Sequence, residues 1–233
     1  MNQDSLPQTL PSSTKQYAAI ARAHLNKVYL WMSVCMLITA GVAAYTAQSV
    51  PALTWVMEHQ MLTFIGILGI ILVMNFGARA LTSGALGVLL LVFAAAQGLI
   101  FGPLLTVYTQ ESLGLTFGCT AGMFGAMSLY GAMTKRDLSG LGRTLMMILF
   151  GLIVATIVNI FWGNGFFDLV CSVVGVVLFS LLTAYDTQKI LEQGTSDDPV
   201  IRSKGAVFGA LALYLDFLNL FLYLLHFLGR NNE

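Results

Sequence analysis

Two apolar segments near the C-terminus decide the fold: CSVVGVVLFSLLTAYDTQKIL at residues 171–191 and GAVFGALALYLDFLNLFLYLLHFL at residues 205–228. A helix needs about 20 residues to cross the apolar core of a bilayer, and both segments are long enough. Each also contains one aspartate, Asp186 in the first and Asp216 in the second. An ionised side chain at membrane depth costs on the order of 3 kcal/mol, so it is rare without a partner or a function. These two acids are therefore the leading candidates for functional residues.

The composition of the whole chain indicates an integral membrane protein. Hydrophobic residues make up 57% and charged residues only 9% of the 233 residues, and the mean hydropathy is +0.80. Soluble domains carry about a quarter charged residues. The formal net charge is zero, so nothing favours a nucleic-acid partner. Cys35, Cys119 and Cys171 lie in apolar runs without CxxC spacing, and we expect them to be buried packing residues rather than disulfides or metal ligands.

The apolar runs predict an all-α protein with seven transmembrane helices, at about residues 28–47, 61–77, 84–107, 113–133, 145–162, 166–190 and 205–228. A polar N-terminal tail, residues 1–27, precedes the transmembrane domain, residues 28–233. The tail lacks the apolar region and cleavage site of a signal peptide. We expect it to be disordered at the front and helical from about Tyr17. The links between helices are short, except for a longer one at residues 191–204.

The positions of lysine and arginine predict the orientation, because basic residues collect in cytoplasmic links. With a cytoplasmic N-terminus, ten of the eleven basic residues fall on the inside: Lys15, Arg22, Lys27, Arg79, Lys135, Arg136, Arg143, Lys189, Arg202 and Lys204. Arg230 alone falls outside. We therefore expect the N-terminus in the cytoplasm and the C-terminus outside.

Small and polar residues indicate which helix faces pack together. In the last segment a small and polar stripe recurs at steps of four and three residues: Gly205, Gly209, Ala212, Asp216, Asn219 and Tyr223. A matching stripe lies in the preceding segment: Ser172, Gly175, Phe179, Thr183 and Asp186. We expect the two stripes to face each other. Two further predictions are a close helix contact at Gly118, Gly122 and Gly125, and a kink at Pro103.

Contact between the two acids depends on their depth in the membrane. Asp216 lies eleven residues beyond Gly205, which is about 16 Å along a helix. Asp186 lies close to the basic end of its own segment. The carboxylates meet if the last helix begins below the membrane interface or the preceding helix extends past it. They would then resist double ionisation and titrate as a pair; otherwise they are two independent polar residues.

Other polar residues within the predicted helices have two interpretations each. Arg79, at the end of the second predicted helix, is either the cation that pairs with Asp186 or an interface arginine. Gln97, Asn75 and Asn159 either line a water path or form interhelical hydrogen bonds.

Four motifs occur in order along the chain: AGMFGAMSLYG at 121–131, TKRDLSG at 134–140, TAYDTQK at 183–189 and LYLDFLNLF at 213–221. Together they resemble the Bax inhibitor-1 family, and its bacterial branch most closely, from about Val28 to the C-terminus. The resemblance implies six helices around a central seventh, and a pH-sensitive calcium leak through the membrane. The 191–204 link is longer than in some bacterial relatives.

The resemblance also implies roles for particular residues. The diaspartyl pH sensor of the family matches Asp186 and Asp216, and its latch arginine best matches Arg79. Calcium prefers oxygen ligands, so the two aspartates are candidate calcium ligands. Candidate residues lining the pathway are Asn219, Tyr214, Tyr185, Thr183 and Gln97. No cofactor is implied, since calcium is the transported ion.

The sequence leaves more than one function open. We favour a proton-gated calcium leak in a bacterial inner membrane, with calcium, protons and the lipid bilayer as partners. The alternative is a membrane regulator without transport, which binds a membrane-bound protease or a channel. We expect no enzyme activity: an intramembrane aspartyl protease would have Gly-x-Gly before its second acid, where this chain has Tyr214-Leu215. A retinal receptor is disfavoured because residues 205–228 contain no lysine.

Overall fold

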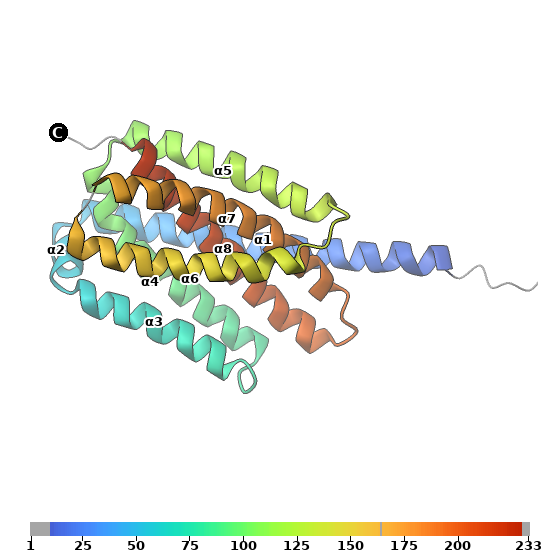
Figure 1. Cartoon of the computed structure of the whole chain (residues 1–233). Helices are drawn as coiled ribbons and strands as arrows, with labels where there is room; N and C mark the ends of the chain where they lie inside the picture. The colour runs from blue at the N-terminus through green and yellow to red at the C-terminus, as the bar shows by residue number, and fades with distance from the viewer. Residues whose placement is uncertain (1–9, 164, 230–233) are drawn as a thin grey trace, which may run out of the picture.

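A computed structural model describes residues 10–163 and 165–229, which form eight α-helices and no strands (Figure 1). The helices are α1 (Leu10–Gln48), α2 (Val50–Glu58), α3 (Gln60–Gly77), α4 (Ser83–Val107), α5 (Gln110–Met133), α6 (Ser139–Trp162), α7 (Gly165–Gly194) and α8 (Pro199–Leu228). All except α2 are long and apolar enough to cross a membrane. The predicted all-α membrane protein with seven transmembrane helices is confirmed.

The N-terminal part of the chain differs from the prediction in two ways. Helix α1 begins at Leu10 rather than near Tyr17, while residues 1–9, the front of the predicted tail, lie outside the described part of the chain. Ala21, His24 and Leu25 of the tail are buried. The second half of the predicted polar tail is therefore part of the packed helical bundle.

Helix α2 was not predicted, because its nine residues are too few to span a membrane. Pro51 lies in its first turn, a position that proline favours because its fixed φ fits a helix start and its missing N–H is not needed there. Val56 is buried, so this short helix covers one end of the bundle.

The prediction of a long link at residues 191–204 is wrong. Helix α7 continues to Gly194 and α8 begins at Pro199, so only residues 195–198 lie between them. Asp198 starts α8, since its carboxylate accepts hydrogen bonds from the amides of Val200, at 2.7 Å, and Ile201, at 3.4 Å. Helices α7 and α8 therefore form a tight antiparallel hairpin.

Helix α8 is the most buried of the seven long helices and runs obliquely through the bundle (Figure 1). It packs against α1, α4, α5 and α7. The expected ring of six helices around it is not confirmed, because α3 packs chiefly on α4 and α6 chiefly on α7.

Glycines allow several helices to approach closely, but not the ones that the spacing indicated. A Cβ atom on Gly131 of α5 would clash with the backbone carbonyl of Ala184 on α7. A Cβ on Gly98 of α4 would lie 2.8 Å from the carbonyl oxygen of Thr39 on α1. By contrast, Cβ atoms built on Gly118, Gly122 and Gly125 would meet no atom within 4 Å. The predicted contact at these three glycines is wrong, because residue spacing marks a small helix face without showing which way it points.

The contact at Gly131 provides a test of the packing between α5 and α7. We expect Gly131→Ala to lower stability by about 1–3 kcal/mol, because the added methyl group meets backbone rather than a movable side chain. Gly125→Ala, on the same helix, is the matched control and should be neutral or slightly stabilising. Thermal unfolding of the purified variants in detergent measures the difference. Equal midpoints for the two variants would show that α5 and α7 do not approach closely at Gly131.

Candidate functional site: a buried acid pair between α7 and α8

The two ends of the bundle differ in charge. Three short links, residues 78–82, 134–138 and 195–198, lie at the same end as the N-terminal part of α1 (Figure 1). We call this the basic end, because nine basic residues lie in or close to these segments: Arg22, Lys27, Arg79, Lys135, Arg136, Arg143, Lys189, Arg202 and Lys204. Helix α2 and the C-terminal end of α8 lie at the opposite end. Arg230, expected on the opposite side, is outside the described residues.

The structure brings the two predicted acids together inside the bundle. Asp186 of α7 is 8% exposed and Asp216 of α8 is 4% exposed. Their carboxyl groups interact directly, side chain to side chain. The Oδ2 atom of Asp216 is buried and receives no hydrogen bond from any described residue. The chain therefore leaves one carboxylate oxygen of the pair unsatisfied, and a proton or a cation is the partner that fits such an atom.

The contact forms because the two predicted stripes face each other, as expected. The ring of Phe179 on α7 stacks on Tyr223 of α8, with centroids 5.8 Å apart. A Cβ on Gly175 would meet the same tyrosine ring, so this glycine makes room for it. Nearer the basic end, Gly209 of α8 packs against Ile190 of α7. The short turn at residues 195–198 sets this register and brings the two acids to the same depth.

The predicted ion pair between Arg79 and Asp186 is not formed in the structure. Arg79 lies beyond the last residue of α3, and its side chain is exposed. The end of α3 is held instead by Lys204, whose Nζ donates to the carbonyl of Ala78 at 2.9 Å and lies 3.5 Å from that of Arg79. The cation that acts electrostatically on Asp186 is Lys189, three residues further along α7.

A chain of hydroxyl groups beside Asp186 joins three helices. Thr187 of α7 donates to the carbonyl of Thr183 at 2.7 Å, so it accepts from Ser128 of α5 at 2.9 Å. Ser128 is in turn hydrogen-bonded to Tyr29 of α1. Tyr29 and Ser128 were not predicted as partners from the sequence, although Ser128 lies within the 121–131 motif. These bonds fix the face of α7 that carries Asp186.

A second contact joins α7 to the link between α5 and α6, at the basic end. The amide of Gln188 donates to the carbonyl of Arg136 at 2.9 Å and accepts from the backbone N–H of Leu138 at 2.8 Å. Gln188 thus fastens the link between α5 and α6 to α7. It connects the 134–140 motif with the 183–189 motif, which are far apart in the sequence.

The predicted pathway-lining residues have defined places in the structure. Tyr214 is fully buried, and its hydroxyl lies 2.6 Å from Thr39 Oγ1. Thr183 and Asn219 hydrogen-bond to carbonyls of their own helices, at 2.8 Å in each case. The Tyr185 ring packs on Gly142 of α6, and Gln97 is half-buried on α4. The structure does not show these five residues along one water path, and their role in a pathway stays a prediction.

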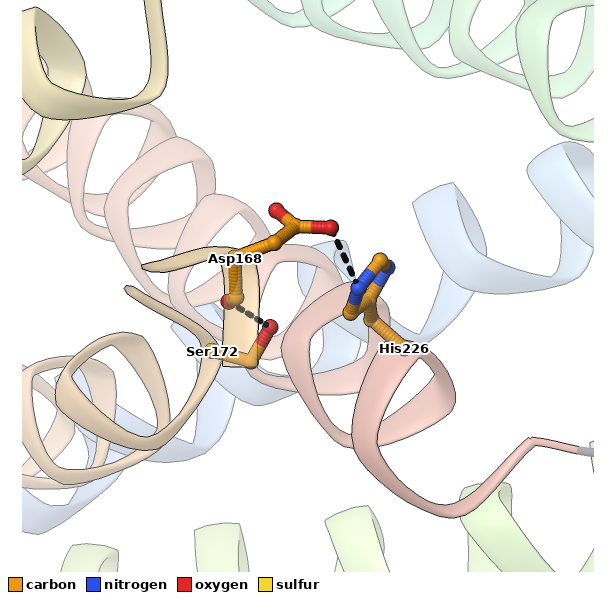
Figure 2. Close-up of polar contacts among 3 residues, drawn as sticks. All are labelled: Asp168, Ser172 and His226. Carbon is orange, nitrogen blue, oxygen red and sulfur yellow. Dashed lines mark hydrogen bonds and ion pairs between the residues drawn. The ribbon is translucent and has the colours of Figure 1, made fainter. Parts of the chain in front are cut away.

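An ion pair closes the α7–α8 hairpin at the opposite end (Figure 2). Nε2 of His226 lies 2.8 Å from Oδ2 of Asp168, and the hydroxyl of Ser172 donates to the Asp168 carbonyl at 3.0 Å. Sequence reasoning missed this pair, because it depends on the register of the hairpin. Both side chains are substantially exposed, so the contact, which is an ion pair only when His226 is protonated, contributes at most about 1 kcal/mol.

The acid pair supplies only part of a metal site. The described residues contain no group of three or more His, Cys, Asp or Glu side chains that could hold a metal ion. A calcium ion at Asp186 and Asp216 would take its remaining ligands from hydroxyl, amide, carbonyl or water oxygens.

These features define an all-α integral membrane protein whose two last helices enclose a pair of aspartates. The family model described as Inhibitor of apoptosis-promoting Bax1 matches residues 21–233. The chain belongs to this family, the Bax inhibitor-1 family, as the four motifs suggested.

Bacterial relatives match almost the whole chain. The inner membrane protein YbhL of Escherichia coli K12 is 39% identical over 97% of this chain and 99% of the relative. A protein of Borreliella burgdorferi is 37% identical over 94% of this chain and 97% of its own length. Protein RP147 of Rickettsia prowazekii is 36% identical, with 97% of each chain covered.

The hydroxyl of Tyr214 provides a test of how α8 is fixed beside the acid pair. Thr39 already donates its single proton to a backbone carbonyl, so Tyr214 is the donor in their contact. We expect Tyr214→Phe to lower stability by about 0.6–1.5 kcal/mol, the range for a buried hydrogen bond. Tyr130→Phe, at a side chain that is 46% exposed, is the control and should have no effect. Thermal unfolding in detergent measures the stability of both variants. If Tyr214→Phe is as stable as wild type, the hydrogen bond between Tyr214 and Thr39 does not stabilise the protein.

Proposed function

We propose that this chain is a pH-sensitive calcium leak channel or transporter, gated by the diaspartyl pair Asp186 and Asp216 between α7 and α8. The observation that carries the proposal is the direct contact of two buried carboxyl groups, one of which has an oxygen without a donor. Membership of the Bax inhibitor-1 family supports it, and so does the resemblance of the motifs. The protein needs no cofactor for this function and performs no enzymatic reaction.

The pair responds to protons because two carboxylates in contact cannot both ionise easily in a medium of low dielectric constant. With one proton between them, they form a charge-assisted hydrogen bond, which is roughly twice as strong as a neutral one. This bond joins α7 to α8 and keeps the pathway closed. A second proton removes the charge and weakens the bond, so the two helices separate more easily as the pH falls.

Calcium passes when this contact opens. The carboxyl oxygens of the pair and the side chains of the facing stripes then offer oxygen ligands in the middle of the bundle. Arg79 has no part in this mechanism, since its side chain is exposed and forms no ion pair with Asp186. A membrane regulator, the alternative function, would offer its partner the N-terminal tail or residues 191–204, and most of the second segment is helical.

The gate is tested by calcium flux into proteoliposomes at pH values from 8 to 6. We expect wild-type flux to rise about tenfold as the pH falls, which corresponds to about 1.4 kcal/mol in the α7–α8 contact. Asp186→Asn and Asp216→Asn each remove one of the two titrating groups and should abolish most of this response. Glu192→Gln, at an exposed acid on α7, is the matched control and should behave as wild type. If both aspartate variants keep the wild-type flux and pH response, the pair is not the gate.

We also propose that the protein lies in a bacterial inner membrane with its basic end in the cytoplasm. The relative YbhL is named an inner membrane protein, and the positive-inside rule supports the orientation.

Single cysteines report the orientation directly. In a variant with Cys35, Cys119 and Cys171 changed to serine, Ser196→Cys marks the α7–α8 turn and Gln60→Cys marks the opposite end. We expect a membrane-impermeant maleimide to label Gln60→Cys in intact spheroplasts and Ser196→Cys only after lysis. The reverse pattern would overturn the proposed orientation.

A further inference from the structure

A pocket of about 440 Å³ lies at the basic end, between the N-terminal part of α1 and the first turns of α8. Its polar lining comes from both helices, with His24 and Lys27 on α1 and Arg202 and Ser203 on α8. The pocket is separate from the acid pair. Neither the family motifs nor the proposed calcium leak uses it.

His24 is the best-defined group in this pocket. Its side chain is 7% exposed, and its Nε2 atom is buried without a hydrogen-bond partner among the described residues. A Cβ on Gly194 would lie 2.9 Å from the His24 Cβ, so the end of α7 packs tightly against this residue. Gly205 of α8 lies against the imidazole ring itself. The ring is thus confined by α7 and α8, and a buried polar atom left unsatisfied is unfavourable.

Two cations face the same space. Lys27 and Arg202 line the same pocket as His24. Neither cation forms an ion pair with an acid of the described residues. Two acids, Asp197 and Asp198, precede Arg202 in the sequence; Asp198 accepts hydrogen bonds from the first amides of α8, and Asp197 forms no ion pair with a described residue. The pocket therefore gathers an excess of positive charge and hydrogen-bond donors.

We propose that this pocket binds a phosphate group, held by Lys27 and Arg202. An arginine and a lysine together suit phosphate oxygens, since a guanidinium donates two parallel hydrogen bonds and an ammonium adds a point charge. Basic pockets between transmembrane helices near the membrane surface bind lipid head groups in the same way. The phosphate belongs either to the head group of an anionic phospholipid or to a small molecule in solution. Its binding joins α1 to α8, the helix that carries Asp216.

The experiment uses the full chain in detergent and two probes. Native mass spectrometry measures binding of dioleoyl phosphatidic acid, with dioleoyl phosphatidylcholine, a zwitterion of zero net charge, as the comparison. Thermal unfolding at constant ionic strength measures stabilisation by inorganic phosphate relative to chloride. The double variant Lys27→Gln/Arg202→Gln removes the two cations of the pocket. Lys135→Gln/Arg143→Gln is the matched control, since it removes two exposed cations at the same end of the bundle.

We expect the pocket variant to bind at least one probe about tenfold or more weakly than wild type, while the control variant binds normally. Loss of phosphatidic acid binding identifies a lipid head group, and loss of stabilisation by inorganic phosphate identifies a soluble ligand. His24→Gln, which keeps a polar side chain, should weaken binding less than the double variant. The proposal is overturned if neither probe binds to wild type, or if the pocket variant and the control variant bind both probes equally.

Discussion

Burial of two carboxyl groups against each other is the constraint on which the rest of this structure depends. An acid in apolar surroundings is costly unless something neutralises or hydrogen-bonds it. Here each acid has the other as its neighbour, and Asp216 keeps one oxygen without a donor. The surrounding helices hold this contact in place. Ser128 and Tyr29 fix α7, while Thr39 fixes α8 through Tyr214.

Sequence reasoning predicted the number and position of the long helices well, because twenty apolar residues in a row have few alternatives to a transmembrane helix. It also predicted that the stripes around Asp186 and Asp216 face each other, since their periods match. It failed at Gly194 to Pro199, where a helix cap and a proline shorten the link to four residues. The polar residues of the 191–204 segment are typical of a loop in the sequence, but in the structure most of them extend α7 and α8 beyond their apolar segments.

Predictions that depended on which way a helix face or a side chain points were less successful. Spacing alone selected Gly118, Gly122 and Gly125 as a packing face, whereas Gly131 makes the close contact with α7. Charge alone suggested that Arg79 reaches Asp186, but Lys204 occupies the end of α3. The pair of His226 with Asp168 depends on the register of α7 and α8, which becomes known only when the turn between them is known. Each of these features is determined by tertiary packing and leaves little trace in a single sequence.

Fixed contacts at both ends of α8 limit where the proposed gate can move. At the basic end, Lys204 binds the carbonyl of Ala78, directly after α3, and the first turns of α8 pack beside His24 of α1. At the opposite end, His226 pairs with Asp168. The acid pair lies between these two anchors. A change in its protonation therefore acts most easily on the middle of the α7–α8 contact, by bending or rotating α8 locally, because displacing the whole helix would break the contacts at both ends at the same time.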